Sequence, residues 1–170
     1  FGACTWAGVA AAIFLLLFSD WTLRLLNAPD EVEALAGAYL PLLALAALLE
    51  AYNLVMASIL RAHLYARDTL YVMLVMHATH LALAFPLLLG VGSWNGLGLA
   101  GYALALTLSR ALGVALHLWL WRRRMNLAPR RRDWWHCPAR ALMPVLRIGI
   151  PGASLEGAYR IAFMMSLSAA

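Results

Sequence analysis

Two carboxylates interrupt long apolar runs of this chain, where an ionised side chain must be paired or used. Glu50 lies within the run from about 35 to 60, and Glu156 follows Pro151 by five residues. A buried carboxylate can accept a proton or bind Na⁺. The alternative for Glu156 is an ion pair with Arg160, which is four residues away and therefore on the same helix face. For Glu50 we weigh a place in a water-filled cavity against a hydrogen bond to another helix.

Other polar side chains lie in the same apolar runs. Tyr52 and Asn53 follow Glu50 closely, and we expect the three to line a cavity together. His77 and His80 are three residues apart and share a helix face, so they are further cavity candidates. Two imidazoles could relay protons or bind a metal, but no third ligand stands at ordinary spacing, and we predict no metal site. Hydrogen bonding between helices is their commoner use.

Three arginines inside or beside apolar runs are expected to be structural charges. Arg110 has no acidic residue within four positions, so we expect it to pair with a residue of another helix or to extend toward an interface. Arg61 ends its apolar run, and Arg160 has Glu156 one helical turn away.

The composition indicates a membrane protein. The 170 residues are 64% hydrophobic and 12% charged, whereas soluble domains are about half apolar and about a quarter charged. An apolar helix of about 20 residues crosses a bilayer core at roughly 1.5 Å per residue. We expect such helices at about residues 7–26, 35–60, 69–89, 97–121 and from 142 onward, the last one cut short. The predicted fold class is an all-α integral membrane bundle with several spans.

The run that begins near Leu97 orients all the others. Small residues at three- and four-residue steps in its first half favour close helix packing in lipid. Trp94, Trp119 and Trp121 lie at its two ends, as an aromatic belt would. The arginines between Arg122 and Arg132 follow, and clustered arginines in short loops stay in the cytoplasm. The loop near residues 62–68 is also basic, whereas those near 27–34 and 90–96 are not, so alternate loops share a side.

The positive charge is local. The net charge is +5, all 13 basic residues are arginine, and eight of them lie between Arg122 and Arg147. Because they flank an apolar span, we expect them to contact anionic lipid headgroups rather than nucleic acid. His63, His117 and His136 are expected at interfaces, and Cys4 and Cys137 are not expected to form a disulfide.

An enzyme is a weak interpretation of this sequence. It contains no Gly-x-Ser-x-Gly, no phosphate-binding P-loop and no His-Glu-x-x-His motif. A membrane enzyme that uses His77 and His80 is the last of the alternatives, and no cofactor is predicted.

Four stretches, in this order and spacing, carry a resemblance to one family. They are Glu33-Ala34 to Tyr39-Leu40 after the Pro-Asp-Glu turn, Ser58-Ile59-Leu60-Arg61-Ala62 with Asp68 to Tyr71, the small-residue run Gly96 to Ala105 with Ser109-Arg110, and Leu146-Arg147-Ile148-Gly149-Ile150-Pro151. Taken together they resemble the multidrug and toxic compound extrusion (MATE) family of secondary transporters. The chain departs from the family pattern at His77 and His80, where members often carry asparagine.

The resemblance implies part of a twelve-helix transporter with two lobes around a central cleft. The chain would cover roughly helices three to seven. Residues 1–121 would give four transmembrane helices of the N-terminal lobe, 122–141 a basic cytoplasmic connector, and 142–170 the start of the C-terminal lobe. The remaining helices of the parent chain would be its partners, in the cell membrane, with a bacterial inner membrane expected.

The resemblance also implies an activity. The protein would be a Na⁺- or H⁺-coupled antiporter for multidrug efflux, exporting small organic, often cationic, xenobiotic compounds, with Glu156 as the coupling-ion candidate. A flippase for lipid-linked oligosaccharide precursors shares the plan and would need a more cationic cavity. A non-transporting structural subunit is the alternative from another class, and Glu156→Gln would then leave every phenotype intact.

Overall fold

The structure is a computed structural model that describes residues 1–25, 30–92 and 94–168. Within the helices, the side chains of 15, 18–25, 30–36, 38, 139, 141, 145, 148, 155, 156, 160, 161 and 163–168 lie outside the description. The described elements are α1 (Gly2–Leu25), α2 (Asp30–Ala62), α3 (Ala66–Leu89), α4 (Leu99–Met125), the 3₁₀ helix η1 (Arg131–Trp134) and α5 (Ala139–Ser168). They fall into two units, residues 1–135 and 136–170.

Among the described residues, three helices are long and apolar enough to cross a membrane, all in the first unit. They are Tyr39–Ala62 of α2, Ala66–Leu89 of α3, and Gly98–Met125, which contains α4. The predicted all-α membrane bundle is confirmed. The expected spans at 7–26 and from 142 onward correspond to α1 and α5, and both reach into residues whose side chains are outside the description.

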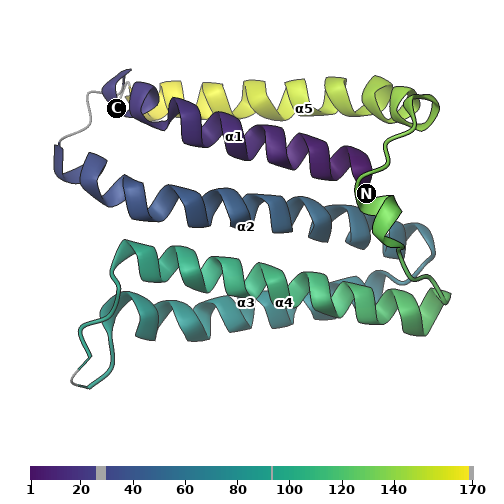
Figure 1. The fold of residues 1–170 in the computed structure, drawn as a ribbon, viewed down its shortest axis with the longest axis horizontal. Helices are drawn as coiled ribbons and strands as arrows, with labels where there is room; N and C mark the ends of the chain where they lie inside the picture. Colours follow the sequence, from purple (N-terminus) through teal and green to yellow (C-terminus); the bar gives the residue numbers. More distant parts are fainter. Residues whose placement is uncertain (26–29, 93, 169–170) are drawn as a thin grey trace. The chain divides into compact units, whose positions relative to one another are not determined.

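Helix α4 lies between α2 and α3 and packs against both, whereas α1 packs on α2 (Figure 1). Small residues allow this close packing. A Cβ added at Gly101 would lie 2.0 Å from the backbone oxygen of Leu87 in α3. Thr107 donates from its hydroxyl to the backbone oxygen of Leu42 in α2 at 3.0 Å. The small residues predicted to bring helices together are therefore confirmed at the α3–α4 contact.

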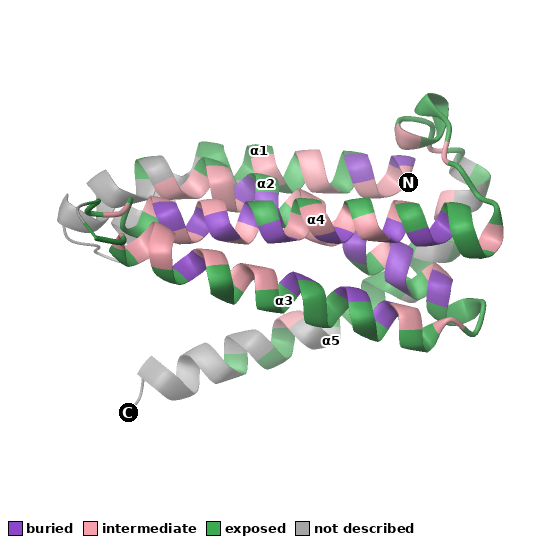
Figure 2. Ribbon diagram, turned by 90° about the horizontal axis from the view of Figure 1, so that it is seen from below, coloured by how far each residue is buried: buried purple, intermediate pink, exposed green. Residues whose placement is uncertain are grey.

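The bundle is apolar outside and partly polar inside. Phe14, Leu17 and Leu81 are each at least 60% exposed, on the outer surface. The buried polar side chains include Asn53, Ser109 and His117. Figure 2 shows in purple that buried residues recur along α3 and α4. A soluble protein would expose the polar groups and bury the large apolar ones. This arrangement suits a lipid environment, where polar groups must find partners within the protein.

One end of the bundle carries the basic segments. Arg124 at the end of α4 binds Asp68 at the start of α3 with two hydrogen bonds of 2.8 and 3.2 Å. At the same end η1 lies against the beginning of α1, where Thr5 donates from its hydroxyl to the Trp134 carbonyl (Figure 1). The two loops that the sequence predicts to share a side therefore meet at one end.

The opposite end of the bundle carries the loop between α3 and α4 (Figure 1). Gly90 and Gly96 have φ angles of +85° and +70°, which favour glycine. Each would also place an added Cβ within 2.6 Å of backbone atoms of this turn. The backbone N–H of Leu97 donates to the Leu87 carbonyl at 2.8 Å, which satisfies a carbonyl at the end of α3.

Of the two tryptophans predicted to lie in an interfacial belt at the end of α4, one is exposed and the other is buried. Trp119 is 52% exposed, as expected for an interfacial belt. Trp121 was expected there too and is instead buried at 4% exposure. Its ring packs with Met56 and Leu60, and its indole N–H donates to the Met56 carbonyl at 3.4 Å. Two residues on a helix are about 200° apart, so both rings cannot face lipid.

Candidate functional site

Three ionisable or titratable side chains lie near the middle of the three spans. Glu50 is near the midpoint of Tyr39–Ala62, His77 of Ala66–Leu89, and Arg110 of Gly98–Met125. A charge at the centre of a transmembrane helix costs roughly 2.5–3.5 kcal/mol on insertion scales and marks a functional candidate by default.

Glu50 and Arg110 form an ion pair between α2 and α4. The Arg110 Nε atom lies 3.0 Å from Glu50 Oε2. The Arg110 side chain is 15% exposed and that of Glu50 is 35% exposed. Among the described residues, Glu50 Oε2 and Arg110 Nη1 have no aligned hydrogen-bond partner although both atoms are buried. The pair cancels the two charges but leaves hydrogen-bonding capacity unused.

Asn53 connects α2 to α4 one turn further along. Its amide nitrogen donates to the Arg110 carbonyl at 3.0 Å. The His117 ring contacts the Asn53 Oδ1 atom at 3.1 Å and the Gly113 carbonyl at 2.9 Å, both through Nδ1. Because a carbonyl oxygen can only accept, Nδ1 carries the hydrogen. In the neutral ring, His117 Nε2 is therefore an acceptor, and it is buried without a partner among the described residues.

Gly113 makes this approach possible. A Cβ there would lie 2.7 Å from the Met76 sulfur and 2.8 Å from Asn53 Oδ1. The absence of a side chain at Gly113 thus lets α2, α3 and α4 converge. We call the group formed here by Glu50, Asn53, Arg110 and His117 the polar cluster.

A small cavity adjoins the cluster. Its volume is about 100 Å³. It is lined by Glu50, Asn53, Leu54, Ala57, Arg61, Thr69, Val72, Met73, Met76, His77 and His117. Sites for drug-sized ligands measure roughly 300–1,000 Å³. This cavity is large enough for water or a small cation, and an organic molecule would need additional space.

The structure brings together only some of the predicted cavity residues. Glu50, Asn53 and His77 line the cavity. Tyr52 lies on another side of α2, where its hydroxyl is 2.6 Å from that of Thr5. Two residues turn a helix by about 200°, so Tyr52 cannot share the face of Glu50. His80 packs edge-on against the Tyr102 ring, with the centroids 5.1 Å apart.

The predicted structural charges have different surroundings. Arg110 pairs across helices, which is one of the two expected outcomes. Arg61 is exposed at the end of α2, donates to the Ser58 hydroxyl at 3.0 Å and borders the cavity. Glu156 and Arg160 belong to α5, but their side chains lie outside the described residues. Their predicted roles stay predictions.

His117 corrects an expectation. The sequence predicts an interfacial His117, and it is instead buried at 3% exposure. The spacing contained the signal, since His117 follows Arg110 by seven residues, which is nearly two helical turns. Gly113 lies between them on the same face of α4. On α2, Asn53 follows Glu50 by three residues and therefore shares its face.

The fold and the cluster define a class of protein, a helical membrane bundle with charged and polar groups near the middle of its spans. The MatE family model matches residues 2–85. The chain is also 24% identical over 143 residues to "Uncharacterized transporter YisQ" of Bacillus subtilis (strain 168), which covers 84% of this chain and 31% of that protein. No solved structure matches the chain. Both matches support the resemblance to the MATE family, and the chain spans about a third of the length of this relative.

Proposed function

We propose that the full-length protein is a cation-coupled antiporter, driven by Na⁺ or H⁺, that exports organic compounds across the cytoplasmic membrane. The observation that carries the proposal is the Glu50–Arg110 pair near the middle of two spans, beside a cavity of about 100 Å³. The match of residues 2–85 to the MatE family and the similarity to a transporter support it.

The cluster offers a carboxylate whose pairing can change. A proton or a Na⁺ ion at Glu50 would compete with Arg110 for the same oxygen atoms. Coupling requires that the ion and the substrate bind two conformations with different affinities. A carboxylate that exchanges an arginine partner for an ion would provide that difference in this lobe, and Glu156 remains the candidate in α5.

Binding of an organic substrate requires parts of the full-length protein that lie outside this chain. The described cavity is smaller than an ordinary ligand site, as noted above. We infer that the substrate binds where this lobe faces the remaining helices of the parent chain.

The test is efflux of a fluorescent organic cation from cells that lack their own pumps and express the full-length protein. Efflux is measured with and without a Na⁺ gradient, for the parent protein, Glu156→Gln and Glu50→Gln. Asp133→Asn is the matched control, because Asp133 is an exposed carboxylate in η1, outside the spans. We expect efflux to fall at least tenfold in one of the two glutamate variants and to persist in Asp133→Asn. Normal efflux in both glutamate variants would contradict the coupling role.

The flippase alternative predicts a more cationic cavity. Arg110 is neutralised by Glu50, so the interior arginine does not favour that alternative. Absence of efflux from correctly inserted protein would nevertheless direct attention to lipid-linked sugars as the next cargo.

A further inference from the structure

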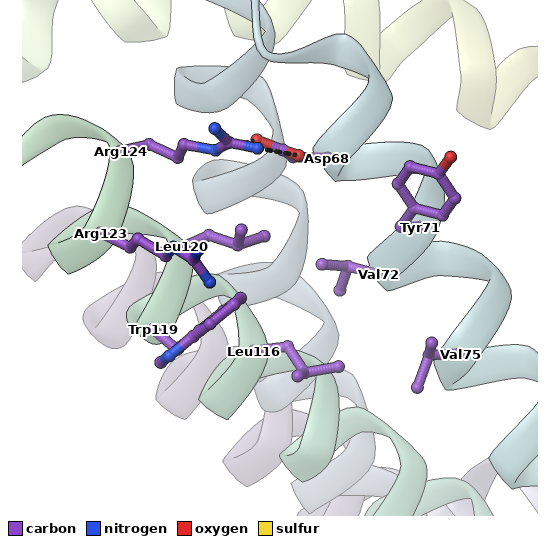
Figure 3. A pocket seen from close by; sticks show the side chains of 9 residues that line it. All are labelled: Asp68, Tyr71, Val72, Val75, Leu116, Trp119, Leu120, Arg123 and Arg124. Carbon is purple, nitrogen blue, oxygen red and sulfur yellow. Dashed lines mark hydrogen bonds and ion pairs between the residues drawn. The ribbon is translucent and has the colours of Figure 1, made fainter.

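A second, larger hollow lies between α3 and α4 at the basic end of the bundle. Its volume is about 270 Å³, and all its lining residues belong to the first unit (Figure 3). They are Asp68, Tyr71, Val72, Val75, Leu116, Trp119, Leu120, Arg123 and Arg124. We call this hollow the α3–α4 groove. It is separate from the polar cluster, and only Val72 borders both.

The charges at the mouth of the α3–α4 groove do not cancel. Arg124 is bound by Asp68, as Figure 3 shows at one end of the groove. Arg123 has no carboxylate partner among the described residues, and its guanidinium lies 5.1 Å from the centre of the Trp119 ring. One positive charge is therefore held in place by an aromatic ring and is free to bind an anion.

The rest of the groove is apolar and runs toward the middle of the membrane. Val75 and Leu116 line the groove at the end opposite the ion pair (Figure 3). Asp68 and Val75 are seven residues apart, so the groove extends about 11 Å along α3 at roughly 1.5 Å per residue. Half of a bilayer core is about 15 Å thick. The groove thus has the polarity of one leaflet, charged at the surface and apolar below, over most of its depth.

We propose that the α3–α4 groove binds one anionic phospholipid of the cytoplasmic leaflet. Its phosphate contacts Arg123, and one acyl chain lies along Val72, Val75 and Leu116. A zwitterionic lipid has the same chains but no net negative charge to match Arg123. The proposal goes beyond a diffuse attraction between the arginines and headgroups, because it assigns one site, and it does not depend on the coupling ion or the exported compound.

The test uses the purified full-length protein in mild detergent. Phosphatidylglycerol or phosphatidylcholine with identical acyl chains is titrated while the thermal unfolding midpoint is recorded. We expect saturable stabilisation by phosphatidylglycerol at lower concentrations than by phosphatidylcholine. Arg123→Gln should weaken apparent binding of phosphatidylglycerol about fivefold, since an arginine near a lipid surface is worth about 1 kcal/mol.

Two control variants separate a site from general effects. Arg131→Gln removes the same charge from η1, outside the groove, and should leave binding unchanged. Val75→Trp should fill the groove and abolish the difference between the two lipids, whereas Leu81→Trp, at an exposed position of α3 outside it, should not. Equal responses to both lipids, or equal losses in Arg123→Gln and Arg131→Gln, would overturn the proposal. Lipid discrimination that survives in Val75→Trp would show that the groove is not the site.

Discussion

At the scale of residues, the two described charges near the middle of the spans are partners rather than isolated groups. Glu50 and Arg110 would each be expensive alone near the middle of a span. Their contact at 3.0 Å removes most of the net charge from the lobe interior. The pair therefore serves stability and, in the proposed function, supplies a carboxylate that an ion can compete for.

The first prediction concerns this pair. Glu50→Gln and Arg110→Gln should each destabilise the full-length protein, because each leaves one uncompensated charge. The double variant should be less destabilised than the sum of the two, with a coupling energy of about 0.5–3 kcal/mol. Thermal unfolding in detergent measures the cycle. Strictly additive effects would mean that the two side chains do not interact in the folded protein.

The second prediction concerns Asn53. Asn53→Leu removes two hydrogen bonds between α2 and α4, the one to the Arg110 carbonyl and the one from His117 Nδ1, which then keeps only the Gly113 carbonyl. We expect a loss of about 1–3 kcal/mol in the free energy of unfolding. Ser58→Ala, which removes an exposed hydroxyl from the same helix, should change it by no more than about 0.5 kcal/mol. Similar losses in both variants would argue against the Asn53 network.

At the scale of elements, α4 determines how the lobe is assembled, because it contacts both α2 and α3. The spans could be predicted from the sequence, since length and hydropathy alone decide whether a helix crosses a bilayer. The Glu50–Arg110 pair could not, because 60 residues separate its members and only packing brings them together. The burial of His117 and Trp121 could not be predicted either, because packing decides which side of α4 faces the other helices.

The third prediction concerns Gly101 and Gly113, where α4 packs closely against its neighbouring helices. Gly101→Ala should destabilise the protein by about 1–3 kcal/mol, because the new methyl group meets a backbone oxygen that cannot move aside. Gly113→Ala should also destabilise the protein, because the methyl group meets the Met76 sulfur, which can shift, and the Asn53 amide, which is held by two hydrogen bonds. Gly37→Ala, with no atom within 4 Å of the added Cβ, is the control. If Gly101→Ala changed the free energy of unfolding no more than Gly37→Ala does, the close α3–α4 contact would be refuted.

At the scale of the whole molecule, the two ends of the lobe differ in charge. The basic end joins the turn between α2 and α3 to the end of α4 through Asp68 and Arg124. The other end includes the uncharged loop between α3 and α4 and the start of α2, whose first residues are acidic. Arginine-rich loops remain in the cytoplasm, so the first unit has one predicted orientation.

The fourth prediction tests this orientation. In a cysteine-free full-length protein, Ala128→Cys should react with a membrane-impermeant thiol reagent only after the cells are opened. Val91→Cys, in the turn between α3 and α4, should react in intact cells. Both positions are exposed, so accessibility to the reagent reports the side of the membrane. The reverse pattern would invert the topology and place the α3–α4 groove in the outer leaflet.

The central claim is that this lobe belongs to an ion-driven exporter of organic compounds. The most direct measurement reconstitutes the purified full-length protein in vesicles, with an imposed Na⁺ or pH gradient as the sole source of energy, and follows movement of a fluorescent organic cation against its own gradient. We predict uphill movement that stops when the gradient collapses and that is lost in Glu50→Gln or Glu156→Gln. Uphill movement that neither variant alters would contradict the coupling role, and no movement under either gradient would contradict the antiporter itself.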